Sequence, residues 1–187
     1  MTKARSRRDD RPEIILDAAE ALLRRSGSRT LTIDAVAAEA GLSKGGVLHH
    51  YASKDALVTA LAARKVQRLR DGIAEQARSR GDGAATLPLA LIAHARDVYA
   101  EECGFPDSLL IASAENAEAV AGFRAFLAEH LTEMQGLEAR SGAGSALVFS
   151  VLGLMLSRSL GFHQLEGPDL ERLFDALELQ ARALPEA

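Results

Sequence analysis

The sequence has little of what several protein classes require. It holds a single cysteine, Cys103, and no tryptophan among its 187 residues. One cysteine excludes a disulfide within the chain and a cysteine-rich zinc site, which favours a reducing, cytoplasmic compartment. The neighbouring Glu101 and Glu102 are expected to raise the pKa of this thiol, so we treat it as unreactive. The sequence therefore excludes a disulfide scaffold and predicts no metal site or cofactor.

Residues that favour strands are also scarce. Valine, isoleucine and threonine number 8, 6 and 6, or 20 together, against 35 alanines and 28 leucines, or 63 together. Alanine and leucine favour helices, whereas β-branched side chains favour strands. The composition therefore predicts an all-α protein.

The net charge of −4 hides an uneven distribution. Residues 1–80 contain 16 lysines and arginines and 10 acidic residues, giving +6, whereas residues 81–187 contain 6 and 16, giving −10. Such asymmetry is expected when one part of a chain meets a polyanion and the other does not. The first part is the candidate for nucleic-acid binding.

No segment predicts export or a membrane span. The basic start, MTKARSRRDD, has no apolar run behind it and so does not resemble a signal peptide. Residues 141–157 form an uncharged run of 17 residues, which is short for a span and diluted by glycine and serine. The favoured interpretation is a helix buried on most sides, as at a subunit interface, and no membrane association is predicted.

Apolar periodicity, prolines and capping residues predict the order of helices. After a first helix at about 12–26, Thr32 is expected to cap a short helix that Gly41 ends, and Ser43 to cap a second short helix. Two short helices joined by a glycine-containing turn are typical of a helix-turn-helix. Ser53 then caps a long helix to about residue 78. Further helices are expected at about 86–102, 106–115, 117–139, 143–162 and 168–183.

The segment TIDAVAAEAGLSKGGVLHHYASKDAL, residues 32–57, together with the helix before it and the acidic helical remainder, resembles the TetR (tetracycline repressor-like) family of transcriptional regulators. The resemblance is specific over about residues 10–60. It implies a helix-turn-helix domain at 1–53 and a regulatory and dimerisation domain at 54–187. The expected partners are double-stranded operator DNA, a small-molecule effector and a second copy of the chain.

The resemblance also implies which residues contact DNA. Thr32, Ser43 and Lys54 would contact phosphates, and the recognition helix and its edge would supply Lys44, Gly45, Gly46, His49 and His50. Where most relatives have a tyrosine that contacts phosphate, this chain has Leu48, so that contact is absent or is replaced by one of the two histidines. Which histidine faces DNA stays open.

Two further interpretations stay open. Gly45 and Gly46 either permit close approach to the duplex or merely loosen a helical turn. The basic residues before the first helix either contact DNA or form a solvated tail. They are Lys3, Arg5, Arg7, Arg8 and Arg11.

A ligand pocket in the second part would need an apolar lining with a few polar anchors. The candidate polar anchors are His94, Tyr99 and Asn116, and the candidate lining residues are Phe105, Leu109, Phe123, Phe126, Met134, Phe149, Leu152 and Met155. For each apolar member an ordinary core position is the favoured interpretation.

The sequence contains neither a nucleophile elbow nor a phosphate-binding loop, so an enzyme is not expected. The favoured function is a ligand-responsive DNA-binding repressor. In this hypothesis the long helix transmits effector binding to the spacing of two recognition helices, and the last two helices form the dimer interface. The alternative is a small helical enzyme or a ligand-binding protein without DNA binding.

Overall fold

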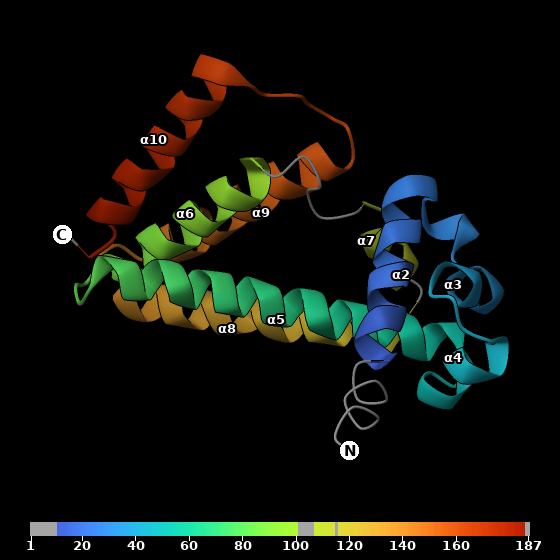
Figure 1. Cartoon of the computed structure of the whole chain (residues 1–187). Coiled ribbons are helices and arrows are strands. Elements are labelled where there is room, and N and C mark those ends of the chain that lie inside the picture. The colour runs from blue at the N-terminus through green and yellow to red at the C-terminus, as the bar shows by residue number, and fades with distance from the viewer. Residues whose placement is uncertain (1–10, 101–106, 115, 186–187) are drawn as a thin grey trace. The chain divides into compact units, whose positions relative to one another are not determined.

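The computed structural model describes residues 11–100, 107–114 and 116–185, and every element within them is helical. In chain order they are α2 (Arg11–Ser26), the 3₁₀ turn η1 (Ser28–Thr30), α3 (Ile33–Glu39), α4 (Lys44–His50), α5 (Lys54–Arg80), α6 (Thr86–Ala100), α7 (Asp107–Ala114), α8 (Ala117–Leu137), α9 (Ala143–Ser159) and α10 (Gly167–Ala183). The all-α prediction is confirmed (Figure 1). Cys103, Phe105 and the basic residues before Arg11 lie outside the described residues.

Helix boundaries follow the predicted caps. The hydroxyl oxygens of Thr32, Ser43 and Ser53 accept hydrogen bonds from backbone N–H groups three residues later, at 3.1, 3.1 and 3.0 Å. Gly41 has φ +64°, and Leu42 N–H donates to the carbonyl of Ala37 at 2.9 Å, which closes α3 in a Schellman motif. Short polar side chains and one left-handed glycine thus fix the helix-turn-helix locally.

The last predicted boundaries need one correction. The helix expected at 143–162 ends at Ser159, because Gly161 adopts φ +70° and Phe162 N–H donates back to the carbonyl of Ser157 at 2.8 Å. A left-handed glycine after a helix satisfies its final carbonyls and ends it. The predicted ends that fall on described residues agree with the structure to within about two residues for the other helices, as helix termini generally do. The ends predicted at 102, 106 and 115 lie outside the described residues.

The chain forms two compact units. The first comprises residues 1–65 and 106–122, and the second comprises residues 66–105 and 123–187. In the first unit, α2, α3 and α4 gather at the start of α5 (Figure 1), and α2 packs against α3 and α7. Its core includes Ile15, Leu23, Leu31, Val36, Val47 and Leu57, all at most 2% exposed. The core therefore joins the helix-turn-helix to the first turns of the long helix.

The second unit has a separate core between α6, α9 and α10, with α8 and the remainder of α5 against it. Phe174 of α10 is fully buried in this core, where its ring meets the Tyr99 ring edge-on with centroids 5.9 Å apart. Arg96 lies over the Phe174 ring at 4.8 Å and binds carboxylates of Glu171 and Glu178, so it ties α6 to α10. No helix among the described residues is long and apolar enough to cross a membrane.

Candidate nucleic-acid interface

The outward face of α4 can be derived from burial along seven residues. Val47 is fully buried and anchors the helix, whereas Lys44, Gly45, Leu48 and His49 are exposed. An α-helix advances about 100° per residue. Relative to Lys44, Leu48 therefore lies at about 40°, Gly45 at about 100° and His49 at about 140°. The four exposed residues share one continuous face.

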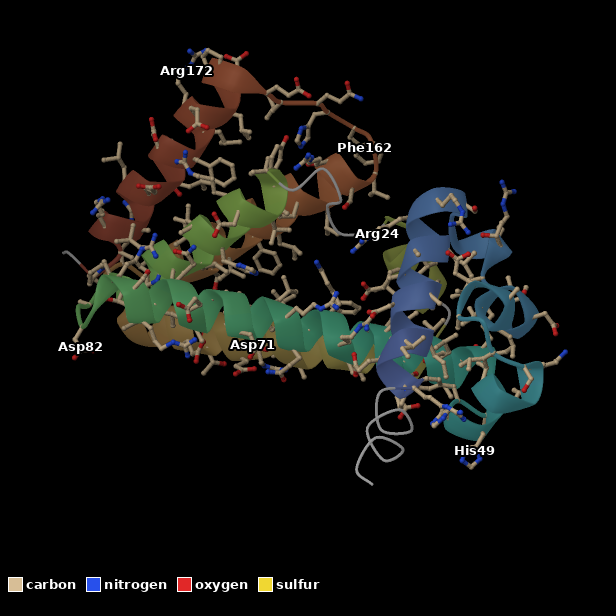
Figure 2. The ribbon with its side chains drawn as sticks, in the orientation of Figure 1. Arg24, His49, Asp71, Asp82, Phe162 and Arg172 are labelled. Atoms are coloured by element: carbon tan, nitrogen blue, oxygen red, sulfur yellow. The ribbon has the colours of Figure 1, made fainter. Side chains whose placement is uncertain are left out.

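The two histidines have different environments. His49 is exposed and projects from the outer side of the helix (Figure 2), whereas His50 is partly buried. Their rings meet edge-on with centroids 5.1 Å apart, so the half-buried ring supports the exposed one. Among the residues with described placement, no cluster of histidine, cysteine, aspartate or glutamate could hold a metal ion. The structure thus selects His49 as the histidine that faces outward.

The two glycines of α4 also differ. A Cβ placed on Gly45 would meet no protein atom within 4 Å, whereas a Cβ on Gly46 would lie 3.3 Å from Oγ of Ser43. Packing within the protein therefore gives a reason for glycine at position 46 and none at position 45. A missing side chain on an exposed helix face leaves room for something else to approach the backbone.

Hydroxyl and ammonium groups stand at the N-termini of α3, α4 and α5. Thr32, Ser43 and Lys54 are all exposed, and Lys54 is the first residue of α5. Each hydroxyl accepts a backbone hydrogen bond, so its own proton remains available to an external acceptor such as phosphate. Lys44 Nζ lies 2.9 Å from a carboxylate oxygen of Asp34. Both partners are largely exposed, so this pair is weak and can be exchanged for a phosphate.

The helix before the helix-turn-helix is tied to α5 by an arginine that sequence reasoning missed. Arg64 of α5 is 11% exposed and binds three carboxylates along α2, from Glu13, Asp17 and Glu20. Its Nε donates to Glu20 at 3.1 Å, and Glu20 is equally buried. Burial alone would lower the pKa of Arg64, but the carboxylates, Glu20 foremost, raise it above its ordinary value. The spacing of the acids at 13, 17 and 20 on one helix face was the available signal.

Two more contacts tie the helices of this unit together. Tyr51, the residue after α4, donates its hydroxyl to the carbonyl of Pro12 at 3.4 Å, and burial first and Glu13 second raise its pKa. Arg25 binds Glu39 at 2.7 Å, and this hydrogen bond lowers the pKa of Glu39. These contacts join α2 to both helices of the helix-turn-helix.

The predicted pocket residues are divided between the two units. Leu109 is buried in the first unit. Asn116, also in the first unit, caps α8 by accepting from the N–H groups of Glu118 and Ala119, and its Nδ2 donates to the carbonyl of Asp55 at 2.9 Å. Its polar atoms are therefore engaged in holding the start of α8 against α5.

The remaining described members lie in the second unit. Tyr99 donates its hydroxyl to the carbonyl of Leu165 at 2.9 Å and stacks on His163, while Arg158 lies 3.7 Å from its ring centre. His94 packs so closely on Gly72 that a Cβ there would overlap its ring. Met134 is buried, Phe149 is 52% exposed, and the partly buried members are Phe123, Phe126, Leu152 and Met155. The structure brings Tyr99 together with two polar residues, Arg158 and His163, that were not predicted.

Two family models match the chain. Residues 15–61 match the bacterial regulatory proteins of the tetR family, and residues 86–182, over half of the chain, match the tetracyclin repressor-like C-terminal domain. The chain belongs to the TetR family. It is therefore a DNA-binding transcriptional regulator, and membership implies operator binding and dimerisation. The family is not enzymatic, so the alternative of a small helical enzyme is wrong.

Solved structures of TetR-like regulators share the fold at low sequence identity. A TetR-family transcriptional regulator from Streptomyces coelicolor is 21% identical, with a TM-score of 0.74 over 95% of this chain and 97% of that one. NalD, the secondary repressor of the MexAB-OprM multidrug efflux pump in Pseudomonas aeruginosa, is 19% identical, with a TM-score of 0.67 over 94% and 98%. SmeT in complex with triclosan is 21% identical, with a TM-score of 0.66 over 92% and 90%. No curated protein matches the chain.

Proposed function

We propose that this TetR-family regulator is a cytoplasmic repressor that occupies an operator as a homodimer and is released by a small molecule. The observation that carries the DNA-binding part is the exposed face of α4, which presents Lys44, Gly45 and His49 together. Thr32, Ser43 and Lys54 flank it as phosphate ligands, and His50 supports His49. In functional terms residues 1–53 bind DNA and residues 54–187 regulate and dimerise.

Phosphate contacts position a regulator on DNA and make binding depend on salt. Lys54→Ala should weaken operator binding and lower the slope of log affinity against log salt by about one per subunit. Arg140→Ala is the matched control, because it removes the same charge from an exposed loop of the acidic part. Equal slopes for wild type and Lys54→Ala would show that Lys54 makes no phosphate contact.

Gly45 tests how closely the backbone approaches the duplex. Because a Cβ at this position meets nothing within the protein, Gly45→Ala should leave the folded state intact or stabilise it by up to about 1 kcal/mol. We expect it to weaken operator binding, since the methyl group occupies the space that DNA uses. An unchanged dissociation constant would show that the glycine only loosens the turn.

The dimer interface is proposed on the exposed apolar side chains of α9 and α10. Phe149 and Leu179 are 52% and 68% exposed, and Leu152 lies partly buried one turn after Phe149. A second copy is the proposed occupant, because a two-fold dimer presents one recognition helix to each half of a palindrome. Phe149→Glu should give monomers in light scattering, whereas Thr132→Glu, on an exposed position of α8, should remain dimeric.

Two of the similar structures support the effector part of the proposal. NalD is a repressor, and the SmeT structure is a complex with triclosan. The candidate pocket residues of the second unit, led by Tyr99 and His94, would bind such a molecule. A ligand that weakens DNA binding must itself bind more weakly to the DNA complex, by thermodynamic reciprocity.

The decisive experiment selects genomic fragments with the purified chain and then screens small molecules for release. Enrichment of defined fragments followed by release with at least one compound supports the proposal. Binding of compounds without any sequence-specific retention of DNA would overturn it in favour of a ligand-binding protein that does not act on DNA.

A further inference from the structure

Leu48 is an aliphatic side chain at the centre of the exposed face of α4. The four exposed residues of this helix span about 140°, from Lys44 to His49. Leu48 and Gly45 are the two nearest the middle of that arc, and Gly45 has no side chain. Leu48 is therefore the central side chain of the face, and it is 37% exposed.

The protein covers Leu48 only in part. Its neighbour Val47 is fully buried and supplies the contact that anchors α4 to the unit. Large apolar side chains with this exposure are uncommon among the described residues, and Leu48 is the one on the helix-turn-helix. The side chain is thus placed to meet whatever lies against α4.

The polar side chains of this face stand at its edges. Lys44, at one edge, is paired with Asp34 of α3, and His49, at the other, rests against His50. Neither Leu48 nor Gly45 offers a side-chain hydrogen bond, so the centre of the face can be read only by shape and apolar contact. In the major groove, the apolar group that distinguishes one base pair from the others is the C5-methyl of thymine.

We propose that Leu48 is a specificity-determining residue that contacts a thymine C5-methyl in each operator half-site. The proposal rests on the proposed function, since it requires that α4 enters the major groove. Leu48 would then exclude water from the methyl group and disfavour cytosine, whose C5 carries only hydrogen in unmodified DNA, at that position. The missing side chain of Gly45 lets the helix come near enough for this contact.

The test starts from synthetic duplexes with a randomised region, which carry no methylated cytosine. Selection with the full-length wild-type chain yields the preferred site, and each thymine of that site is then replaced singly by deoxyuridine, which removes only the methyl group. Burial of one such group is worth about 0.8 kcal/mol, or about fourfold in affinity. Replacement in both half-sites should therefore cost the wild type about sixteenfold.

Leu48→Ala should bind the same site more weakly and should lose its sensitivity to that deoxyuridine, with less than about a twofold difference between the two duplexes. Ile14→Ala is the matched control, because Ile14 is also an exposed aliphatic residue of the first unit, at 44%. This variant should keep the wild-type sensitivity. A cooperative thermal unfolding transition well above the assay temperature shows that each of the three proteins is folded.

The possible results separate this inference from the proposed function. If no replacement of thymine by deoxyuridine weakens binding of the wild type more than binding of Leu48→Ala, the role of Leu48 is overturned and the proposed regulator function is unaffected. A selection that enriches no sequence would overturn the proposed function itself. Loss of methyl sensitivity in Ile14→Ala as well would also overturn the direct contact, because the effect would then not depend on the α4 face.

Discussion

The buried ion pair between Arg64 and Glu20 gives the sharpest stability prediction. The two side chains are each 11% exposed, whereas Glu13 and Asp17, the other carboxylates on Arg64, are 66% and 67% exposed. Removing one partner of a buried pair costs about 3–5 kcal/mol, because a charge remains without compensation, whereas an exposed pair contributes about 0–1 kcal/mol. Arg64→Met should therefore destabilise the protein by about 3 kcal/mol.

Chemical denaturation and thermal unfolding at a fixed protein concentration measure this loss, which corresponds to a fall of about 6–12 °C in Tm for a chain of this size. Arg24 lies 3.6 Å from the other oxygen of Glu20 and offsets part of the loss, and neutralising Glu20 should recover a further part. Arg64→Met combined with Glu20→Gln is expected to be more stable than Arg64→Met alone, with a coupling energy of about 1–3 kcal/mol. Glu13→Gln and Asp17→Asn, on the same helix, are the exposed controls and should each cost less than about 1 kcal/mol.

A loss below about 1 kcal/mol for Arg64→Met would refute the reasoning, since it would place Arg64 among ordinary surface ion pairs. The reasoning would also be refuted if Arg64→Met combined with Glu20→Gln were no more stable than Arg64→Met alone. Arg64 joins α5 to α2 of the DNA-binding unit, so Arg64→Met is also expected to weaken operator binding, and operator affinity provides a second measurement. Arg64→Lys keeps the charge but loses the planar fork, so it should be intermediate in stability.

Three further predictions concern single positions. Asn116→Ala should cost about 1–2 kcal/mol in unfolding free energy through loss of the α8 cap, whereas Asn116→Asp keeps the cap acceptor and should cost less. Gly72→Ala should destabilise by about 1–3 kcal/mol because its Cβ would overlap His94, whereas Gly136→Ala, in open space in α8, should stabilise; the opposite order in thermal melts would contradict the packing argument. Arg70 of α5 donates a hydrogen bond to Glu129 of α8 and thereby lowers the pKa of the Glu129 carboxyl. The pair therefore stabilises the protein at pH values above the ordinary carboxyl pKa, and this stabilisation is lost as pH falls through the lowered pKa. Glu129→Gln should accordingly show a smaller loss of Tm on acidification than wild type, and identical acid profiles would argue against the pair.

Much of the helix-turn-helix could be predicted because its signals are local. A hydroxyl three residues before a free N–H, or a glycine after the last helical turn, acts within a few residues, so Thr32, Ser43 and Gly41 could be assigned from the sequence. The end of α9 was predicted three residues too late, since the apolar pattern continues past Gly161 and does not reveal which glycine turns left-handed.

The candidate sites depended on contacts that periodicity does not specify. Asn116 was predicted as a polar anchor on its residue type, and the structure shows its amide bonded to the backbone of Asp55, 61 residues earlier. Likewise, the adjacent histidines are equivalent in sequence, and only packing against the rest of the unit exposes His49 and partly buries His50.

The sequence by itself determined the helical class, the helix order, the caps of the helix-turn-helix and the opposite charges of the two parts, because each depends on composition or on residues a few positions apart. The tertiary structure decided which side of α4 is exposed and which arginine joins α5 to α2. Those properties depend on residues distant in sequence, and burial decides them. A helix has no outward face until another helix covers the opposite one.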